Sequence, residues 1–194
     1  MARPREFDEN EALARAMQVF WSKGYEATSL CDLIEAMGLS KSSFYDTFGS
    51  KHDLFLSAID HYNETVASRR VAGVIADAEN VRAGIARVFA GVVDDTAAGG
   101  ERRGCFINNC AVELAPRDSA AAARVSAGFA HMETAFFEAV RQGQASGEIG
   151  AGRDARALAR YLTSSLNGVI VMAKANADRA VLDDVVRVVL AALD

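Results

Sequence analysis

Proline and cysteine are scarce in this 194-residue sequence, which contains two prolines and three cysteines. So few prolines leave long stretches without a helix-breaking residue. The cysteines, Cys31, Cys105 and Cys110, form neither the paired spacing of a zinc site nor the dense, even set of a small secreted protein. His52 and His61 add no metal-binding spacing. We therefore expect reduced cysteines, no metal site and no cofactor.

Long apolar runs are also absent. No stretch of about 18 uninterrupted apolar residues is present, so a typical membrane-spanning helix is not expected. The N-terminal "MARPREFDEN" is charged where a secretion signal would be apolar. We therefore expect a cytoplasmic protein without a membrane partner. The formal net charge of −5 argues against a protein that coats nucleic acid through bulk charge, but a local DNA-binding surface stays open.

Motifs typical of enzymes are missing too. We find no nucleophile at a recognisable spacing from a base, no glycine-rich phosphate loop and no pair of carboxylates. The remaining enzymatic alternative is a small ligand-processing protein that uses Cys105. We therefore expect a protein that is not an enzyme.

Helix-forming residues with a period near 3.6 dominate what is present, as in "EALARAMQVF", "ARALARYLTSSL" and "RAVLDDVVRVVLAAL". The pattern predicts an all-α protein. Four N-terminal helices are expected: the first capped by Asp8 and ending near residue 23, the second capped by Thr28 and ending at Gly38, a short third capped by Ser40, and a fourth capped by Ser50 and running to about residue 70. Later helices are expected at about 80–96, 105–115, 118–146, 154–175 and 179–193.

The second and third helices are joined by a short turn, "GLS", that contains glycine. On the third helix Phe44 and Phe48 are four residues apart and face the same core, so Ser42, Tyr45 and Asp46 project outward. Two helices joined in this way form a helix-turn-helix, whose second helix can enter a DNA major groove. A small helical bundle can also contain such a turn without binding DNA.

The segment "TSLCDLIEAMGLSKSSFYDTFGSKHDLF", with the preceding "ALARAMQVFWSKGYEAT", resembles the N-terminal DNA-binding domain of the TetR family of transcriptional regulators. The resemblance spans about residues 9–60. It implies a helix-turn-helix domain over residues 1–52, with three helices, and a helical ligand-binding and dimerisation domain over 53–194. It further implies a homodimeric repressor that binds a pseudo-palindromic operator in double-stranded DNA and is released by a small-molecule effector. The alternative is a helical sensor or carrier protein without operator binding.

The resemblance also implies which residues meet DNA. Thr28 and Ser29 are expected near the phosphate backbone, and Lys51 is expected to contact a phosphate. The expected DNA-facing surface of the third helix comprises Lys41, Ser42, Ser43, Tyr45, Asp46 and Thr47. Tyr45 offers its ring to a thymine methyl group and its hydroxyl to the backbone. A carboxylate at Asp46 would repel phosphates, so it either accepts a hydrogen bond from a cytosine amine or, as we favour, pairs within the protein.

Aromatic and polar residues scattered over the later helices are the mixture that a pocket between helices needs. The candidate ligand-binding residues are Tyr62, Phe89, Cys105, Phe106, Asn109, Phe129, Met132, Phe136 and Asn167. Most of the aromatic residues can equally fill the core. Cys105 follows two arginines at a helix N-terminus, where a thiolate is favoured, so it is either a reactive sensor or an inert packing residue.

The stretches "RRGCFINNCAVELAPRD", "GQASGEI" and the last two helices resemble the C-terminal half of one TetR-like subgroup. By this resemblance the last two helices pair with those of a second subunit in a four-helix bundle. Small residues, Ser165 and Gly168, would permit close approach. The predicted interface comprises Leu158, Tyr161, Leu162, Ser165, Val169, Met172, Val181, Leu182, Val185, Val188 and Val189.

Overall fold

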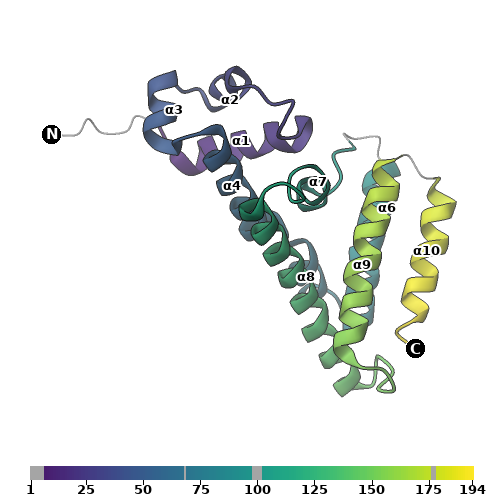
Figure 1. Ribbon diagram of the computed structural model, residues 1–194. Coiled ribbons are helices and arrows are strands. Elements are labelled where there is room, and N and C mark those ends of the chain that lie inside the picture. Colours follow the sequence, from purple (N-terminus) through teal and green to yellow (C-terminus); the bar gives the residue numbers. More distant parts are fainter. Residues whose placement is uncertain (1–6, 68, 98–101, 176–177) are drawn as a thin grey trace.

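The computed structural model describes residues 7–67, 69–97, 102–175 and 178–194, which form helices and no strands (Figure 1). The predicted all-α fold is confirmed. The elements are α1 (Glu9–Lys23), α2 (Leu30–Met37), α3 (Lys41–Phe48), α4 (Lys51–Tyr62), the π-helical turns η1 (Asn63–Ala67) and η2 (Arg69–Gly73), α5 (Val74–Ala76), α6 (Val81–Ala97), α7 (Phe106–Glu113), α8 (Ser119–Ser146), α9 (Ala155–Lys174) and α10 (Arg179–Ala191).

Polar N-caps set where the helices begin. Asp8, Ser40 and Ser50 cap α1, α3 and α4 as predicted, each by accepting a hydrogen bond from a backbone N–H of the first turn. The predicted cap of α2 was wrong by one residue. Ser29, not Thr28, caps this helix, because Ser29 and Asp32 form a reciprocal capping box.

The predicted fourth helix does not continue as an α-helix to residue 70. Regular α4 ends at Tyr62, and the chain continues through η1, η2 and the short α5. The Thr65 hydroxyl donates to the His61 carbonyl at 2.6 Å, a local bond that competes with the regular helix pattern. Asn63 donates through its amide nitrogen to the Arg124 carbonyl of α8 at 3.2 Å. Such tertiary contacts are invisible in the local sequence pattern.

The helices α1 to α3, with the start of α4, form a small head at one end of the molecule (Figure 1). Its core is apolar, with Phe20, Leu33 and Phe44 at most 1% exposed. Between α2 and α3 the chain turns at Gly38, whose φ of 68° lies in the left-handed region that glycine adopts without strain. This turn fixes α3 across α2 and leaves its outer face open.

The remaining helices form a larger body, which α4 enters from the head (Figure 1). Helix α8 packs along α4 and α9, while α10 packs on α6 and α9. The predicted division between residues 52 and 53 falls inside the continuous helix α4 and stays a prediction. Within the described ranges, no helix combines the length and apolar character needed to cross a membrane.

Several contacts besides α4 join the head to the body. The Trp21 indole donates to the Gly104 carbonyl at 3.2 Å. The Glu113 carboxylate, at the end of α7, accepts hydrogen bonds from the backbone N–H groups of Tyr25 at 3.0 Å and Glu26 at 2.9 Å. These bonds attach the end of α7 to the loop that follows α1.

Candidate functional site

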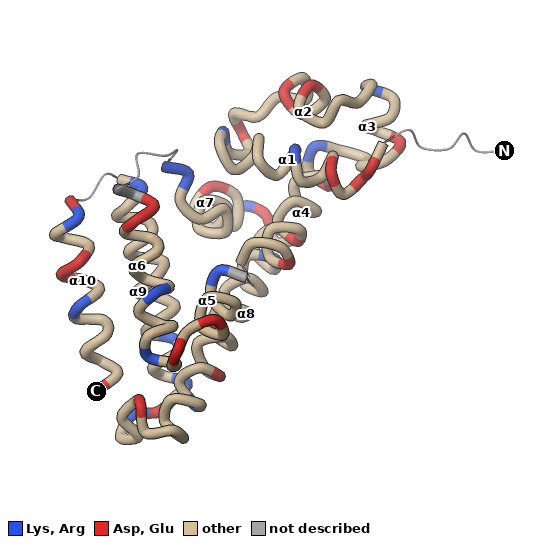
Figure 2. Tube along the Cα trace, turned by 180° about the vertical axis from the view of Figure 1, so that it is seen from behind, with Lys and Arg blue, Asp and Glu red and all other residues tan. Residues whose placement is uncertain are grey.

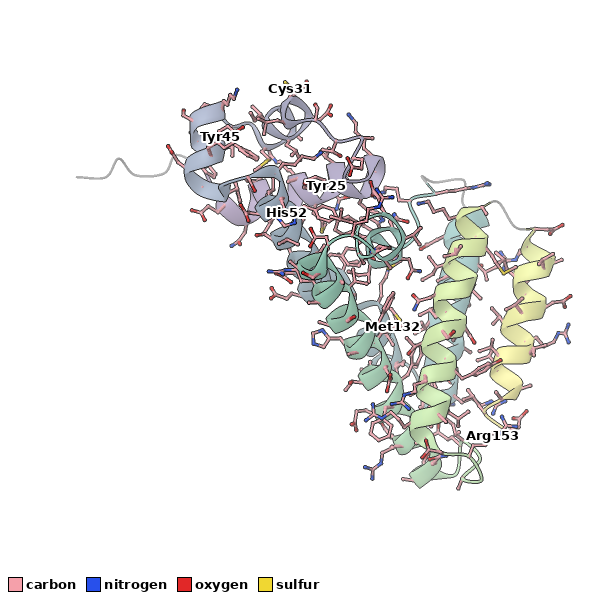
Figure 3. All side chains as sticks on the ribbon, viewed as in Figure 1. Tyr25, Cys31, Tyr45, His52, Met132 and Arg153 are labelled. Carbon is pink, nitrogen blue, oxygen red and sulfur yellow. The ribbon has the colours of Figure 1, made fainter. Side chains whose placement is uncertain are left out.

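The outer face of α3 carries a row of polar side chains and one aromatic ring. Tyr45 is 47% exposed, and its ring packs edge-on against buried Phe44 with 5.3 Å between ring centroids (Figure 3). Lys41, Ser42 and Asp46 are exposed as well. Phe44 therefore holds the Tyr45 ring from behind, and the face as a whole points into solvent.

The first turn of α3 contains three serines that bond to one another. Ser40 Oγ accepts from the Ser43 backbone N–H at 3.1 Å, and it lies 3.0 Å from Ser42 Oγ and 2.9 Å from Ser43 Oγ. Ser43 and Thr47 are half-buried. The three hydroxyls are thus held in place by hydrogen bonds to one another and to the backbone.

The charged residues around α3 lie in different settings. Asp46 is exposed, and its carboxylate has no charged or hydrogen-bonding partner among the residues that the structure describes, so the expected pairing within the protein is not found there. Lys51 is half-buried, with its Nζ 4.4 Å from the centre of the Tyr25 ring. Figure 2 shows both acidic and basic residues along the backbone of the head.

At the start of α2 the two predicted phosphate contacts differ. Thr28 is 1% exposed, and its hydroxyl donates to the Gly24 carbonyl at 2.5 Å, so its side chain does not project into solvent. Ser29 is exposed, with its hydroxyl donating to Asp32 at 2.8 Å. A hydrogen bond from Lys23, followed by those from Ser29, holds the pKa of Asp32 well below the usual aspartate value. Of this pair, Ser29 is the residue whose side chain is exposed to solvent.

A mostly apolar chamber of about 210 Å³ lies in the body. Of the predicted ligand-binding residues, Tyr62, Cys105 and Met132 line it. Sequence reasoning missed the rest of the lining, because apolar residues on helices look alike whether they face a cavity or the core. The missed residues include Val71, Val74, Val88, Val92, Leu166 and Ile170, with Arg70, Arg87 and Asp95 as the charged members.

Two polar groups inside the chamber, Tyr62 and Cys105, pair with each other. The Tyr62 hydroxyl donates to Cys105 Sγ at 3.6 Å, and burial, followed by the nearby Cys105, raises the pKa of Tyr62. Cys105 was predicted in the first turn of this helix, but it is the N-cap of α7, one residue before the helix begins, and it is 4% exposed. Burial also raises the pKa of the Cys110 thiol. Reactivity at Cys105 stays a prediction.

The other predicted ligand-binding residues lie elsewhere. Phe89, Phe106 and Phe136 are at most 1% exposed and belong to the core. Phe129 and Asn167 line a separate shallow groove between α8 and α9. Asn109 lies outside the chamber lining, where it donates to the Arg103 carbonyl at 3.0 Å and accepts from Lys174 at 2.8 Å.

A third surface, the α9/α10 groove, is open and apolar. It is lined by Tyr161, Ser165, Gly168, Val169, Met172, Asp184, Val185, Val188 and Val189. Val188 is 61% exposed and Tyr161 41%, and they lie in one contiguous apolar groove, a feature typical of interaction surfaces. A Cβ placed on Gly168 would meet nothing within 4 Å, so the groove floor can accept close approach.

Several residues predicted for the subunit interface face inward instead. Leu158, Leu162 and Leu182 are at most 5% exposed and pack in the core of their own chain. Val169 and Val189 are also largely buried but reach the groove. The predicted stripes mixed two faces of each helix because α9 and α10 are apolar on both sides. Val181 is 46% exposed but outside the groove lining.

No group of three or more His, Cys, Asp or Glu residues that could hold a metal ion is found in the described ranges. The surfaces and cavities described above give three candidate sites: the exposed face of α3, the apolar chamber and the α9/α10 groove.

Comparison with known proteins assigns the family. Residues 12–58 match the family described as "Bacterial regulatory proteins, tetR family", and residues 80–189 match "Tetracyclin repressor-like, C-terminal domain". The chain is 36% identical to the uncharacterised HTH-type transcriptional regulator YezE of Bacillus subtilis (strain 168), over 100% of both chains. It is 34% identical to the HTH-type transcriptional repressor ComR of Escherichia coli (strain K12), over 90% of this chain and 83% of ComR.

A solved structure of similar shape is that of a cysteine mutant of the TetR family transcriptional regulator CifR, complexed with 26-bp double-strand operator DNA. It aligns with a TM-score of 0.84 and 36% identity, covering 99% of this chain and 100% of CifR. These matches span the head and the body together. The protein is therefore a transcriptional regulator of the helix-turn-helix class. It belongs to the TetR family, which consists of regulators and not of enzymes.

Proposed function

We propose that this chain is a homodimeric repressor that binds a pseudo-palindromic operator and is released by a small-molecule effector. The observation that carries the proposal is the exposed polar face of α3, which buried Phe44 supports from behind. CifR, which shares 36% of its sequence with this chain, was solved with operator DNA on the same fold. The similarity to ComR supports the repressor role.

On the α3 face, each side chain has a chemistry suited to DNA. Tyr45 offers a ring to a thymine methyl group, and Asp46 is available to accept from a cytosine amine. Lys41, Ser42, Ser43 and Thr47 surround them with donors for phosphate oxygens. Ser29 and Lys51 lie at the starts of α2 and α4, where they contact the backbone on either side of the groove.

The occupant that we propose for the α9/α10 groove is a second copy of this chain. The exposed apolar residues Tyr161, Met172 and Val188 would be buried against their counterparts, in a two-fold interface that completes a four-helix bundle. Such a dimer presents two α3 helices, which bind successive major grooves when they are about 34–36 Å apart. A pseudo-palindromic operator follows from this symmetry.

The chamber is the proposed effector site. Helix α4 runs from Lys51 beside α3 to Tyr62 in the chamber wall, so one rigid element joins the two sites. An effector that favours a different spacing of the two α3 helices weakens operator binding. To take the operator from nearly full to nearly empty it must prefer the released state by about 5 kcal/mol.

The domain boundary and the location complete the proposal. We infer that residues 1–52 form the DNA-binding domain and residues 53–194 the ligand-binding and dimerisation domain. A repressor acts where the chromosome is, so we infer a cytoplasmic location.

The test is an electrophoretic mobility shift with the DNA that flanks the protein's own gene, at low and at moderate salt. A repressor forms a discrete complex that persists at moderate salt, since specific contacts outlast the non-specific electrostatic ones. A chain that binds no fragment better than unrelated DNA of the same length is a sensor or carrier and not an operator-binding protein.

A further inference from the structure

A second recess, here called the mouth, adjoins the chamber. It has a volume of about 130 Å³ and shares Arg70, Val92, Asp95 and Ile170 with the chamber lining. Its other lining residues are Trp21, Arg102, Arg103, Gly104, Ala173 and Lys174. A ligand that fills the chamber therefore reaches the mouth with one end.

The mouth is strongly cationic. Arg70, Arg102, Arg103 and Lys174 face it, while Asp95 is the acidic residue in its lining. Asp95 lies 3.5 Å from Arg70, and cationic side chains outnumber acidic ones among the described residues that line the recess. This excess contrasts with the net charge of −5 of the whole chain. Cations gathered around a concave surface attract an anionic group more strongly than scattered ones do.

The chamber requires the opposite chemistry. Its walls are mainly aliphatic. Tyr62 and Cys105 are bonded to each other at 3.6 Å, and of the charged lining residues Arg70 lies 3.5 Å from Asp95 and Arg87 lies 3.9 Å from Glu79. Its volume of about 210 Å³ exceeds that of an apolar cavity of about 150 Å³ that binds benzene. The part of the ligand that enters it is therefore apolar and about as large as a substituted benzene ring.

We propose that the effector is a small organic anion, whose apolar body fills the chamber and whose carboxylate binds in the mouth. This inference rests on the proposed function. Arg70, shared by both recesses, meets the carboxylate where the body ends, and Arg102 and Lys174 complete its surroundings. A neutral ligand of the same shape gains no charge-assisted contact there.

The position of the mouth connects the anion to the DNA-binding head. Trp21 belongs to α1, and its indole donates to Gly104 at 3.2 Å. The Arg103 guanidinium lies 4.5 Å from the centre of the Trp21 ring. A carboxylate that attracts Arg102 and Arg103 thus changes the contact that holds the end of α1 against the body. This gives effector binding a direct route to the orientation of the head.

The experiment uses the full-length dimer and a matched pair of probes, 4-methylbenzoate and the neutral 4-methylbenzamide. Trp21 is the single tryptophan of the chain, so its fluorescence reports on the mouth, and calorimetry measures the affinity independently. We expect the carboxylate to bind at least about tenfold more tightly than the amide, since a charge-assisted contact is lost in the amide.

Substitutions in the mouth and in the chamber test where the carboxylate and the ring of the probe bind. Arg70→Gln and Arg102→Gln should each weaken 4-methylbenzoate binding by about threefold to tenfold and leave the amide unaffected. Arg141→Gln, which removes the same charge from α8 outside both recesses, is the matched control and should bind as wild type does. Val71→Phe, which extends into the chamber, should weaken both probes, with its fold checked by circular dichroism.

The outcomes separate this inference from the proposed function. Equal binding of carboxylate and amide, or equal loss in Arg141→Gln, overturns the anion assignment. Absence of binding by both probes in a dimer that shifts its operator also overturns it, while the repressor function stands. Tighter carboxylate binding by a chain that shifts no operator supports the anion site and refutes the repressor function instead. Release of operator by 4-methylbenzoate, without release by the amide, supports both.

Discussion

The head and the body use their apolar residues differently. In the head, buried and exposed positions are clearly separated, since Phe44 is buried and its neighbour Tyr45 is exposed. In the body the same residue types serve three surfaces. Leu162 fills the core, Ile170 lines the chamber, and Val188 lies in the open α9/α10 groove. A polar face can thus be recognised from its sequence, whereas an apolar face does not reveal its partner.

The largest expected effect comes from Val188→Asp, which introduces a charge into the α9/α10 groove. Burying an unpaired charge between subunits is costly, so we expect monomers by sedimentation velocity. Operator affinity should fall by about 100-fold or more, because a single half-site remains. Leu162 is a poorer target, since it is fully buried in its own chain and a charge there would disturb the fold.

Val112→Asp is the matched control for the groove. Val112 is 80% exposed on α7 and outside the groove lining, so the same substitution should leave both the dimer and operator binding intact. An unchanged dimer in Val188→Asp would refute the assignment of this groove to the subunit interface.

A smaller effect is expected in the head. Tyr45→Ala should weaken operator binding by about 1–3 kcal/mol and relax the sequence preference, because it removes a side chain that faces the bases. Lys51→Ala should weaken binding to all sequences alike and reduce the salt dependence by about one unit. Fluorescence anisotropy at several salt concentrations distinguishes the two patterns.

Neither substitution should alter the dimer or greatly lower the melting temperature, since Tyr45 is exposed and Lys51 is half-buried. Wild-type operator binding by both variants would mean that α3 is not the recognition helix. The expected effects differ in cause from that of Val188→Asp. Substitutions in the head change operator affinity through contacts with DNA, whereas Val188→Asp changes it through the assembly of the dimer.

The link between head and body gives the third test. Trp21→Phe keeps an aromatic ring but removes the hydrogen bond to the Gly104 carbonyl. Such a bond contributes about 0.5–1.5 kcal/mol, so the effect of an effector on operator affinity should decrease by about threefold to tenfold. Affinity for the effector alone, measured by calorimetry, should change less. A full effector response in this variant would show that Trp21 does not carry the coupling.

The smallest effect concerns acid stability at a second link, where His52 Nε2 contacts Asp118 Oδ2 at 2.5 Å. Backbone hydrogen bonds from Ala121, followed by His52, lower the pKa of Asp118 below its usual 3.8. A lowered pKa stabilises the folded state above about pH 4, and this contribution is lost as the pH falls through the folded value. Asp118→Asn should therefore lose less stability than wild type between about pH 5 and about pH 3.

Thermal denaturation across that pH range measures the effect. Asp46→Asn is the control, because Asp46 is equally a carboxylate but is exposed and without a partner among the described residues. Its stability should follow the wild-type pH dependence. If the stability of Asp118→Asn also follows the wild-type pH dependence, the contact between α4 and α8 contributes no pH-dependent stability.

Much of the fold could be predicted because helix limits are local. Asp8, Ser40 and Ser50 precede apolar-periodic segments, and Gly38 follows one, so the sequence contains the signals that begin and end the first helices. Where two hydroxyls are adjacent, at Thr28 and Ser29, the cap of α2 was predicted at the wrong one. The π-helical turns after Tyr62 could not be foreseen, since they accompany contacts with α8.

The sequence by itself determined the helical class, the helix-turn-helix and the outward face of α3, because periodicity and caps act within a few residues. Only the tertiary structure decided that Tyr62, Cys105 and Met132 share a chamber while Phe89 and Phe136 fill the core. It likewise brought Trp21 of α1 beside Arg103, which lies far along the chain just before α7. Such placements depend on how whole helices pack, and the burial of an apolar side chain is favourable against any partner that excludes water.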